Sequence, residues 1–254
     1  MALKPKILIL GGTTEAYALA AALVASDDWQ VISSLAGRTP DPRLPAGETR
    51  IGGFGGVAGL AGYLAEQRIR AVIDATHPFA ATMGWNAQAA CQMAAVALLR
   101  LERPAWSAVP GDQWEPVADW DQAVAALQRG SSRRVLLAVG RQELAPFAGL
   151  SDIWFLIRAV SPPDPMPPFQ SMRLLLARGP FDLKQERNLL DSDRIDSIVC
   201  KNSGGQATDA KLQAARERGL RVIMRQRPQR PELPTVATVE ESLAWLDGQI
   251  ARHA

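Results

Sequence analysis

Short apolar runs alternate with longer stretches of helical spacing along this chain, and no other feature limits its fold as strongly. In the first hundred residues the apolar runs are rich in leucine or β-branched residues, as buried strands are. They cover residues 6–10, 30–35, 71–74 and 95–101. The stretches at residues 14–26, 57–67 and 80–93 are rich in alanine and leucine, which favour helices. This alternation predicts βαβ units and a parallel sheet.

The same alternation starts again in the second half of the chain. Further strands are predicted at residues 134–139, 154–159, 173–177, 196–200 and 221–225. The matching helices are predicted at residues 119–128, 181–190, 208–218 and 239–250. Pro104, Pro110 and Gly111 cluster between the two series and indicate a boundary. We therefore expect two successive α/β domains, residues 1–104 and 105–254.

Composition excludes several classes of protein. Apolar residues make up 47% of the 254 residues and charged residues 21%, which is typical of a globular protein. The formal net charge of +2 is too small to indicate a nucleic-acid partner. Cys91, Cys200, His77 and His253 are the only cysteines and histidines, too few for a His/Cys zinc site or a disulfide framework. We expect no metal site.

One uncharged stretch, residues 75–99, could suggest a membrane span. It contains Pro78, Asn86 and Gln88 among other residues that a spanning helix tolerates poorly. A loop, a buried helix and a strand explain it better. The apolar run at residues 7–10 is too short for the core of a signal peptide. We therefore predict a soluble, cytoplasmic protein that contacts no membrane.

The turn after the first predicted strand indicates a phosphate site. Gly11 and Gly12 let the backbone approach a ligand, Thr13 and Thr14 offer hydroxyls, and Glu15 lies in the first turn of the next helix. The amides at the start of a helix attract anions. The G-x-G-x-x-G spacing is absent, so the usual dinucleotide fingerprint does not apply. An ordinary strand–helix turn with a threonine cap is the alternative.

Two further loops of the first half suit a dinucleotide. The second strand leads to Arg38 and Thr39, and a guanidinium there can clamp the 2′-phosphate that distinguishes NADP from NAD. Gly53 lies in a loop with four glycines in five positions, which allows a cofactor to approach closely. A solvated arginine and a mobile turn are the respective alternatives.

The segment Thr76, His77, Pro78 and Phe79 closes the strand that ends at Asp74. Open α/β sheets bind ligands at the carboxyl ends of their strands. His77 is a candidate for proton transfer. A hydrogen-bonded structural histidine, or one that contacts a bound cofactor, is the alternative.

Lys201, Ser203 and Gly204 take the matching place in the second half, directly after a predicted strand. An amine and a hydroxyl there could hold a carboxylate or orient a nicotinamide, although Ser203 could simply cap the next helix. The two halves share a short internal repeat: Glu15 follows Gly12 by three residues, and Glu143 follows Gly140 by three residues.

Taken together, these motifs resemble those of the precorrin-6A reductases of cobalamin biosynthesis. The resemblance rests on residues 10–15, 35–39 and 73–80, and on residues 103–104, 140–144, 178–181 and 201–205. It implies two Rossmann-like α/β domains with parallel sheets flanked by helices, and NADPH and a tetrapyrrole in a cleft between them. The first domain would bind NADP through residues 11–15 with Arg38 and Thr39, and the second would complete the substrate cleft.

The resemblance also implies a reaction, the reduction of one double bond of precorrin-6A by NADPH to give precorrin-6B. Lys201 and nearby arginines would hold carboxylates of the substrate, and Lys201 or His77 would relay a proton. Transient contact with neighbouring enzymes of the pathway is an expectation of the same kind. Three alternatives stay open: a reductase that acts on cobalt-precorrin-6A with NADH, a nucleotide-using transferase of similar fold, and a tetrapyrrole carrier.

Overall fold

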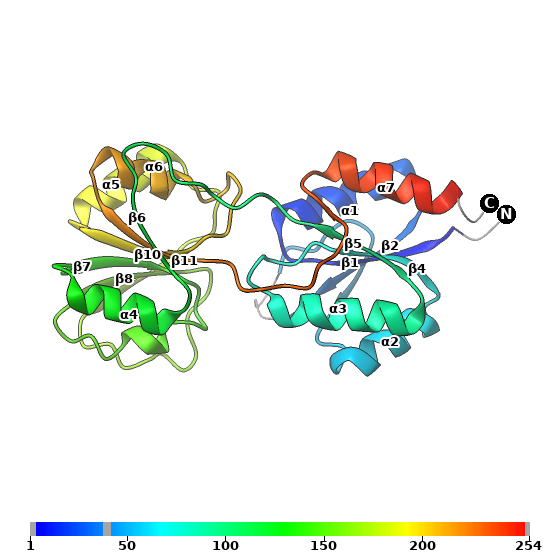
Figure 1. The fold of residues 1–254 in the computed structure, drawn as a ribbon, viewed down its shortest axis with the longest axis horizontal. Helices are drawn as coiled ribbons and strands as arrows, with labels where there is room; N and C mark the ends of the chain where they lie inside the picture. The colour runs from blue at the N-terminus through cyan, green and yellow to red at the C-terminus, as the bar shows by residue number, and fades with distance from the viewer. Residues whose placement is uncertain (1–3, 38–41, 252–254) are drawn as a thin grey trace. The chain divides into compact units, whose positions relative to one another are not determined.

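Both predicted sheets form, and every strand pair in them is parallel. The computed structural model describes residues 4–37 and 42–251, and Figure 1 shows each sheet with helices on both of its faces. The chain divides into two compact units. The first unit comprises residues 1–104 and 228–254, and the second comprises residues 105–227.

The first unit holds a sheet of the order β12-β5-β4-β1-β2-β3. Its strands are β1 (Lys6–Leu10), β2 (Gln30–Leu35), β3 (Glu48–Ile51), β4 (Ile69–Asp74), β5 (Ala97–Leu101) and β12 (Thr235–Val236). Its helices are α1 (Thr14–Ser26), α2 (Gly56–Glu66), α3 (Ala81–Ala94) and α7 (Val239–Ala251). Helices α1 and α7 cover one face of the sheet, and α2 and α3 cover the other.

The second unit holds a sheet of the order β6-β11-β10-β7-β8-β9. Its strands are β6 (Gln113–Val117), β7 (Arg134–Ala138), β8 (Trp154–Ala159), β9 (Met172–Leu176), β10 (Ser197–Lys201) and β11 (Arg221–Arg225). Its helices are α4 (Trp120–Arg129), the short 3₁₀ helix η1 (Ala145–Phe147), α5 (Leu183–Ser192) and α6 (Ala210–Glu217). Helix α4 packs with η1 on one face, and α5 and α6 pack on the other.

Both sheets follow the strand order of a Rossmann fold, in which the third, second, first, fourth and fifth strands lie side by side. The sixth strand of each sheet lies beside the fifth, and the chain reaches it by crossing over from the other unit. After β5 the chain enters the second unit, where β6 pairs with β11. After β11 it returns, and β12 pairs with β5. The expected α/β class with two Rossmann-like parallel sheets is confirmed.

Burial on both faces explains the continuous apolar runs of the central strands. In β1, Ile7 and Ile9 pack with α1 on one face, and Leu8 and Leu10 pack with α2 and α3 on the other. All four are at most 2% exposed. A strand covered on both sides needs apolar residues at every position, so it reads as an unbroken run.

The predicted second domain, residues 105–254, needs a correction at its end. Residues 228–254 fold with the first unit, because β12 extends the first sheet and Leu246 of α7 joins the core formed with α1. Strand–helix alternation alone could not reveal that the chain returns. Within the described residues, no helix is both long enough and apolar enough to cross a membrane.

Candidate functional site

In the first sheet the strand order reverses between β1 and β4, which are adjacent. An open parallel sheet binds ligands at the carboxyl ends of the strands on either side of such a switch point. The turn at residues 11–13 and the start of α1 follow β1, and the loop at residues 75–80 follows β4. The fold therefore brings two of the predicted site segments to the same end of one sheet.

Thr13 joins these two loops. Its hydroxyl donates to the carbonyl of Ala75 at 2.8 Å and accepts from the amide of Ala16 at 3.2 Å, which caps α1. Gly12, beside it, has φ of +108°, a conformation that favours glycine, and a Cβ added there would meet nothing within 4 Å. The turn is thus held firmly on one side and leaves open space beside Gly12.

Glu15 and Thr14 lie in the first turn of α1, where the amides have no partner within the helix. Thr14 is exposed, whereas Glu15 is partly buried and pairs with Arg103 at 2.7 Å. This pairing offsets the negative charge of Glu15 close to the helix start. Arg103 was not among the predicted site residues, although the family resemblance included it.

The loop after β4 is built on Asp74, which is completely buried. One oxygen of its carboxylate accepts from the amide of Thr76 at 3.2 Å and from the Thr76 hydroxyl at 2.6 Å. His77 is partly buried, and its Nδ1 accepts from the amide of Phe79 at 3.2 Å. A nitrogen that accepts is unprotonated, so the proton of the neutral imidazole lies on Nε2. Pro78 is buried.

The glycine-rich loop that contains Gly53 is organised by Arg50 of β3. The guanidinium donates to the carbonyls of Gly52 and Gly53 at 2.8 and 2.9 Å and lies 3.8 Å from the centre of the Phe54 ring. These contacts argue against a mobile turn, because they fix the loop from the neighbouring strand. Arg38 and Thr39, predicted to read a phosphate, lie outside the described residues.

The second sheet has its own switch point, between β7 and β10. Lys201, the last residue of β10, donates to Glu143 at 2.8 Å. The other oxygen of Glu143 accepts from Arg225 at 2.8 Å and from the indole of Trp120. Gly140, with φ of +93°, would place an added Cβ 3.8 Å from the Lys201 ammonium.

Ser203 and Gly204 lie in the loop that follows Lys201. Asn202 anchors this loop, because its buried side chain both accepts from and donates to the backbone of Trp106, at 2.8 and 3.0 Å. Arg227 donates to the carbonyls of Asn202 and Ser203 at 3.1 and 3.2 Å. Helix α6 begins at Ala210 and has Asp209, not Ser203, at its N-cap position, so the alternative that Ser203 caps this helix is wrong.

The short internal repeat in the sequence corresponds to the same arrangement of a glycine, a glutamate and an arginine in each unit. Glu15 and Glu143 each follow a glycine of positive φ by three residues. Each also pairs with an arginine at or just after the fifth strand of its own sheet, Arg103 in the first unit and Arg225 in the second. The structure therefore sorts the predicted residues into two sets of similar design, one in each unit.

Sequence reasoning missed the charged partners of the predicted residues. Glu143, Arg225 and Arg227 in the second unit, and Arg103 in the first, were not named as candidate site residues. One signal could have found Arg225, since a charged residue at the end of an otherwise apolar run stands at a strand end. No local signal marks Glu143 as the carboxylate shared by Lys201 and Arg225, because the partners lie 58 and 82 residues away.

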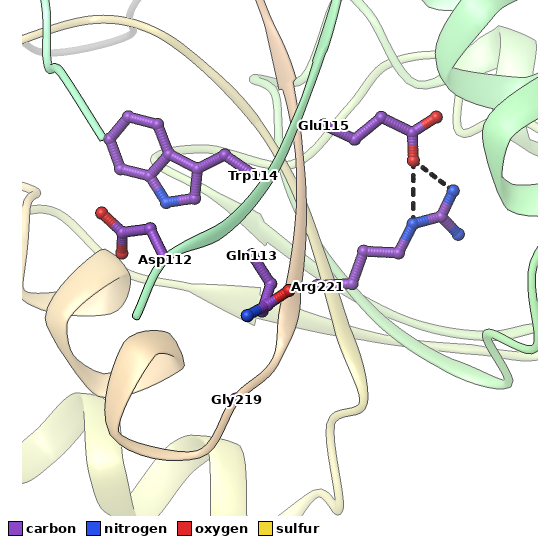
Figure 2. Close-up of a pocket in the computed structure, with 6 residues that line it drawn as sticks. All are labelled: Asp112, Gln113, Trp114, Glu115, Gly219 and Arg221. Atoms are coloured by element: carbon purple, nitrogen blue, oxygen red, sulfur yellow. Dashed lines mark hydrogen bonds and ion pairs between the residues drawn. The ribbon is translucent and has the colours of Figure 1, made fainter. Parts of the chain in front are cut away.

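A hollow of about 440 Å³ lies elsewhere in the second unit (Figure 2). It is lined by Asp112, Gln113, Trp114, Glu115, Gly219 and Arg221. These residues lie at the amino ends of β6 and β11, whereas the candidate residues lie at the carboxyl ends of strands. Figure 2 shows Arg221 paired with Glu115 at its edge. In the described part of the chain, no three His, Cys, Asp or Glu side chains gather to hold a metal ion.

Comparison with known proteins gives one consistent result. The chain matches the family described as Precorrin-6x reductase CbiJ/CobK over residues 6–247. It is 49% identical to a protein named Precorrin-6A reductase from Rhodococcus erythropolis, over 98% of this chain and 99% of that one. It is 46% identical to a protein of the same name from Rhodobacter capsulatus, over 95% of each chain.

A solved structure titled CobK precorrin-6A reductase has the same fold. It superposes with a TM-score of 0.91 at 46% identity and covers 96% of this chain and 97% of that chain. Similarity of this extent spans both sheets and the exchange between them. This chain therefore belongs to the precorrin-6x reductase family.

Proposed function

We propose that this protein reduces precorrin-6A to precorrin-6B in cobalamin biosynthesis, with NADPH as the hydride donor. The observation that carries the proposal is the pair of loops at the first switch point, where Thr13 ties the open turn at Gly12 to the end of β4. Two findings support it: the Rossmann strand order in both units and relatives that bear the name Precorrin-6A reductase.

The residues of the first switch point fit a nicotinamide dinucleotide. The open space beside Gly12 leaves the backbone accessible to a phosphate, and the first amides of α1 point their partial positive charge toward it. Arg103 offsets the charge of Glu15, which would otherwise repel a phosphate. Thr14, Gly53 and the segment from Thr76 to Phe79 complete the proposed contacts, and Arg38 with Thr39 would bind the 2′-phosphate.

When bound, the cofactor supplies the hydride, and the protein must supply position and one proton. One double bond of the macrocycle then gains a hydride at one atom and a proton at the other. We assign the proton to the Lys201 ammonium or to Nε2 of His77, since Nδ1 of His77 accepts from the amide of Phe79. The cations Lys201 and Arg225 would face the carboxylates of the substrate, and Ser203 and Gly204 would contact the nicotinamide cofactor.

The metal-free substrate is favoured over the cobalt-bound one. The relatives named Precorrin-6A reductase are 45–49% identical to this chain. Those named Cobalt-precorrin-6A reductase, from Priestia megaterium and Salmonella typhimurium, are 29% and 28% identical. Because this chain is more similar to the relatives named for the metal-free substrate, precorrin-6A is the proposed substrate.

The test is anaerobic mixing of the purified protein with NADPH and precorrin-6A, following NADPH absorbance and the pigment spectrum. We expect substrate-dependent oxidation of NADPH, and little with NADH. Turnover of cobalt-precorrin-6A alone would contradict the metal-free assignment. Pigment binding without NADPH oxidation would favour a carrier, and binding of a nucleotide sugar instead of NADPH would favour a transferase.

Two variants test the cofactor and proton assignments. Arg38→Ala should raise KM for NADPH about tenfold, or about 1.4 kcal/mol, and leave KM for NADH unchanged. His77→Asn keeps a side-chain acceptor near the amide of Phe79 but removes the titratable group. If His77 relays the proton, kcat falls by about 10² with KM for NADPH unchanged. Wild-type kcat in this variant would show that His77 is not a required donor, and would leave Lys201, water or the substrate's own acid groups.

A further inference from the structure

The segment that returns from the second unit carries an arginine that is buried in the first unit. The Arg230 side chain is only 5% exposed. Its guanidinium donates to Asp74 at 2.6 Å, to the Thr76 hydroxyl at 3.2 Å, and to Glu102. A buried charge is tolerated only where partners replace its lost hydration. Arg230 is therefore built into this place by specific contacts.

Asp74 connects Arg230 to the turn that carries His77. One carboxylate oxygen of Asp74 accepts from Arg230, and the other accepts from the amide and hydroxyl of Thr76. The Thr76 hydroxyl contacts both Asp74 and Arg230. The first residue of the turn is thus fixed by two buried charged groups.

Helix α3 packs closely against this arrangement at Gly84, which has no side chain. A Cβ added to Gly84 would lie 3.1 Å from both Nε and Nη2 of Arg230 and 3.6 Å from a nitrogen of Arg100. Arg100, on β5, is also buried and lies 3.7 Å from Asp74. Strands β4 and β5 and helix α3 therefore all pack around the guanidinium that the returning segment supplies.

We infer that Arg230 is a positioning residue: through Asp74 it fixes the turn at residues 76–79 in the conformation that binds the nicotinamide cofactor. This inference rests on the proposed function. No part of it requires Arg230 to touch the cofactor. The Arg230 guanidinium and the Asp74 carboxylate both contact Thr76, so the buried ionic group supports the turn from outside it.

The experiment compares wild type with Arg230→Lys, which keeps the charge but cannot bridge Asp74 and Glu102 in the same way. Direct titration with NADPH should show about tenfold weaker binding, while KM for precorrin-6A stays within about twofold. Hydrogen–deuterium exchange, measured without any ligand, should rise in peptides that cover residues 74–80.

Arg216→Lys is the matched control. Arg216 also forms two hydrogen bonds, at 2.9 and 3.2 Å, to an aspartate with a buried side chain, Asp112, which is 1% exposed. That pair lies in the second unit near the amino end of β6, away from every candidate residue. Arg216→Lys should leave both NADPH binding and exchange at residues 74–80 unchanged.

The outcomes separate the two proposals. If wild type binds no NADPH, the proposed function fails, and the positioning role fails with it. If wild type binds NADPH and Arg230→Lys binds it equally well, only the positioning role is overturned, even where exchange has risen. Should Arg230→Lys not fold, Glu102→Gln weakens the anchoring of Arg230 without touching the turn, and the same two measurements must move in the same direction.

Discussion

The ammonium of Lys201 lies 2.8 Å from one oxygen of Glu143, and the guanidinium of Arg225 lies 2.8 Å from the other. Two cations thus share one carboxylate at the carboxyl end of the second sheet. The group keeps a net charge of +1 while each cation is held in place. A preorganised surplus of positive charge suits a substrate that carries carboxylates.

Lys201→Ala should therefore weaken binding of the tetrapyrrole. We expect KM for precorrin-6A to rise about tenfold, which corresponds to about 1.4 kcal/mol, and direct NADPH binding to stay unchanged. Lys184→Ala is the matched control, because Lys184 is exposed on α5. An unchanged KM in Lys201→Ala would contradict a role in substrate binding, and an equal loss in Lys184→Ala would point to overall charge instead.

The strands that the sequence did not predict are all edge strands. β3 and β12 are the two edges of the first sheet, and β6 is an edge of the second. A central strand is covered on both faces and paired on both sides, so its sequence is continuously apolar. An edge strand is paired on one side only, so its sequence need not be continuously apolar. β3 reads Glu-Thr-Arg-Ile, β6 contains Pro116, and β12 has only two residues.

The loops of the candidate site were predictable, but their supports were not. Gly12 and Thr13 follow β1, and Lys201 ends β10, so their position at strand ends alone marked them. Arg230 lies 156 residues from Asp74 in the chain, and only the folded sheet brings them together. The return of residues 228–254 to the first unit was unpredictable for the same reason, since pairing of β12 with β5 is a long-range contact.

Thr13 should contribute to stability through both of its hydrogen bonds. Thr13→Ala removes the cap of α1 and leaves the carbonyl of Ala75 without that donor, at a cost of about 2 kcal/mol. Thr13→Ser keeps the hydroxyl and should lose far less. Urea denaturation measures both, with Thr14→Ala as the exposed control. Equal losses for the alanine and serine variants would contradict this assignment.

Cys91 should make the fold less stable at alkaline pH. Burial, and then the nearby charge of Asp74, raise the pKa of its thiol from 9.0 to about 12. Between these values the unfolded chain loses a proton that the folded chain keeps, so stability falls as pH rises, by about 1.4 kcal/mol per pH unit.

Urea denaturation at pH 8, 9 and 10 tests this by comparing wild type with Cys91→Ala. At pH 8 the free energy of unfolding of Cys91→Ala should be lower than that of wild type, because alanine leaves a small cavity. Above pH 9, however, it should fall less steeply with pH than that of wild type. Parallel slopes would show that Cys91 does not cause the loss. Burial also raises the pKa of Cys200, so some alkaline loss should remain in the variant.

Two glycine-to-alanine changes in helices should have opposite signs. At Gly62, on the exposed side of α2, an added Cβ would meet nothing within 4 Å, so Gly62→Ala should stabilise the protein by about 0.5–1 kcal/mol through helix propensity alone.

At Gly84 the same gain in helix propensity is available, but the added Cβ would lie 3.1 Å from two nitrogens of Arg230. That guanidinium cannot yield freely, because Asp74 and Glu102 hold it. Gly84→Ala should therefore lower the free energy of unfolding and loosen residues 74–80 in hydrogen exchange. If it stabilised the protein as much as Gly62→Ala does, the buried ionic group would have room to move, and the close packing around Arg230 would not hold.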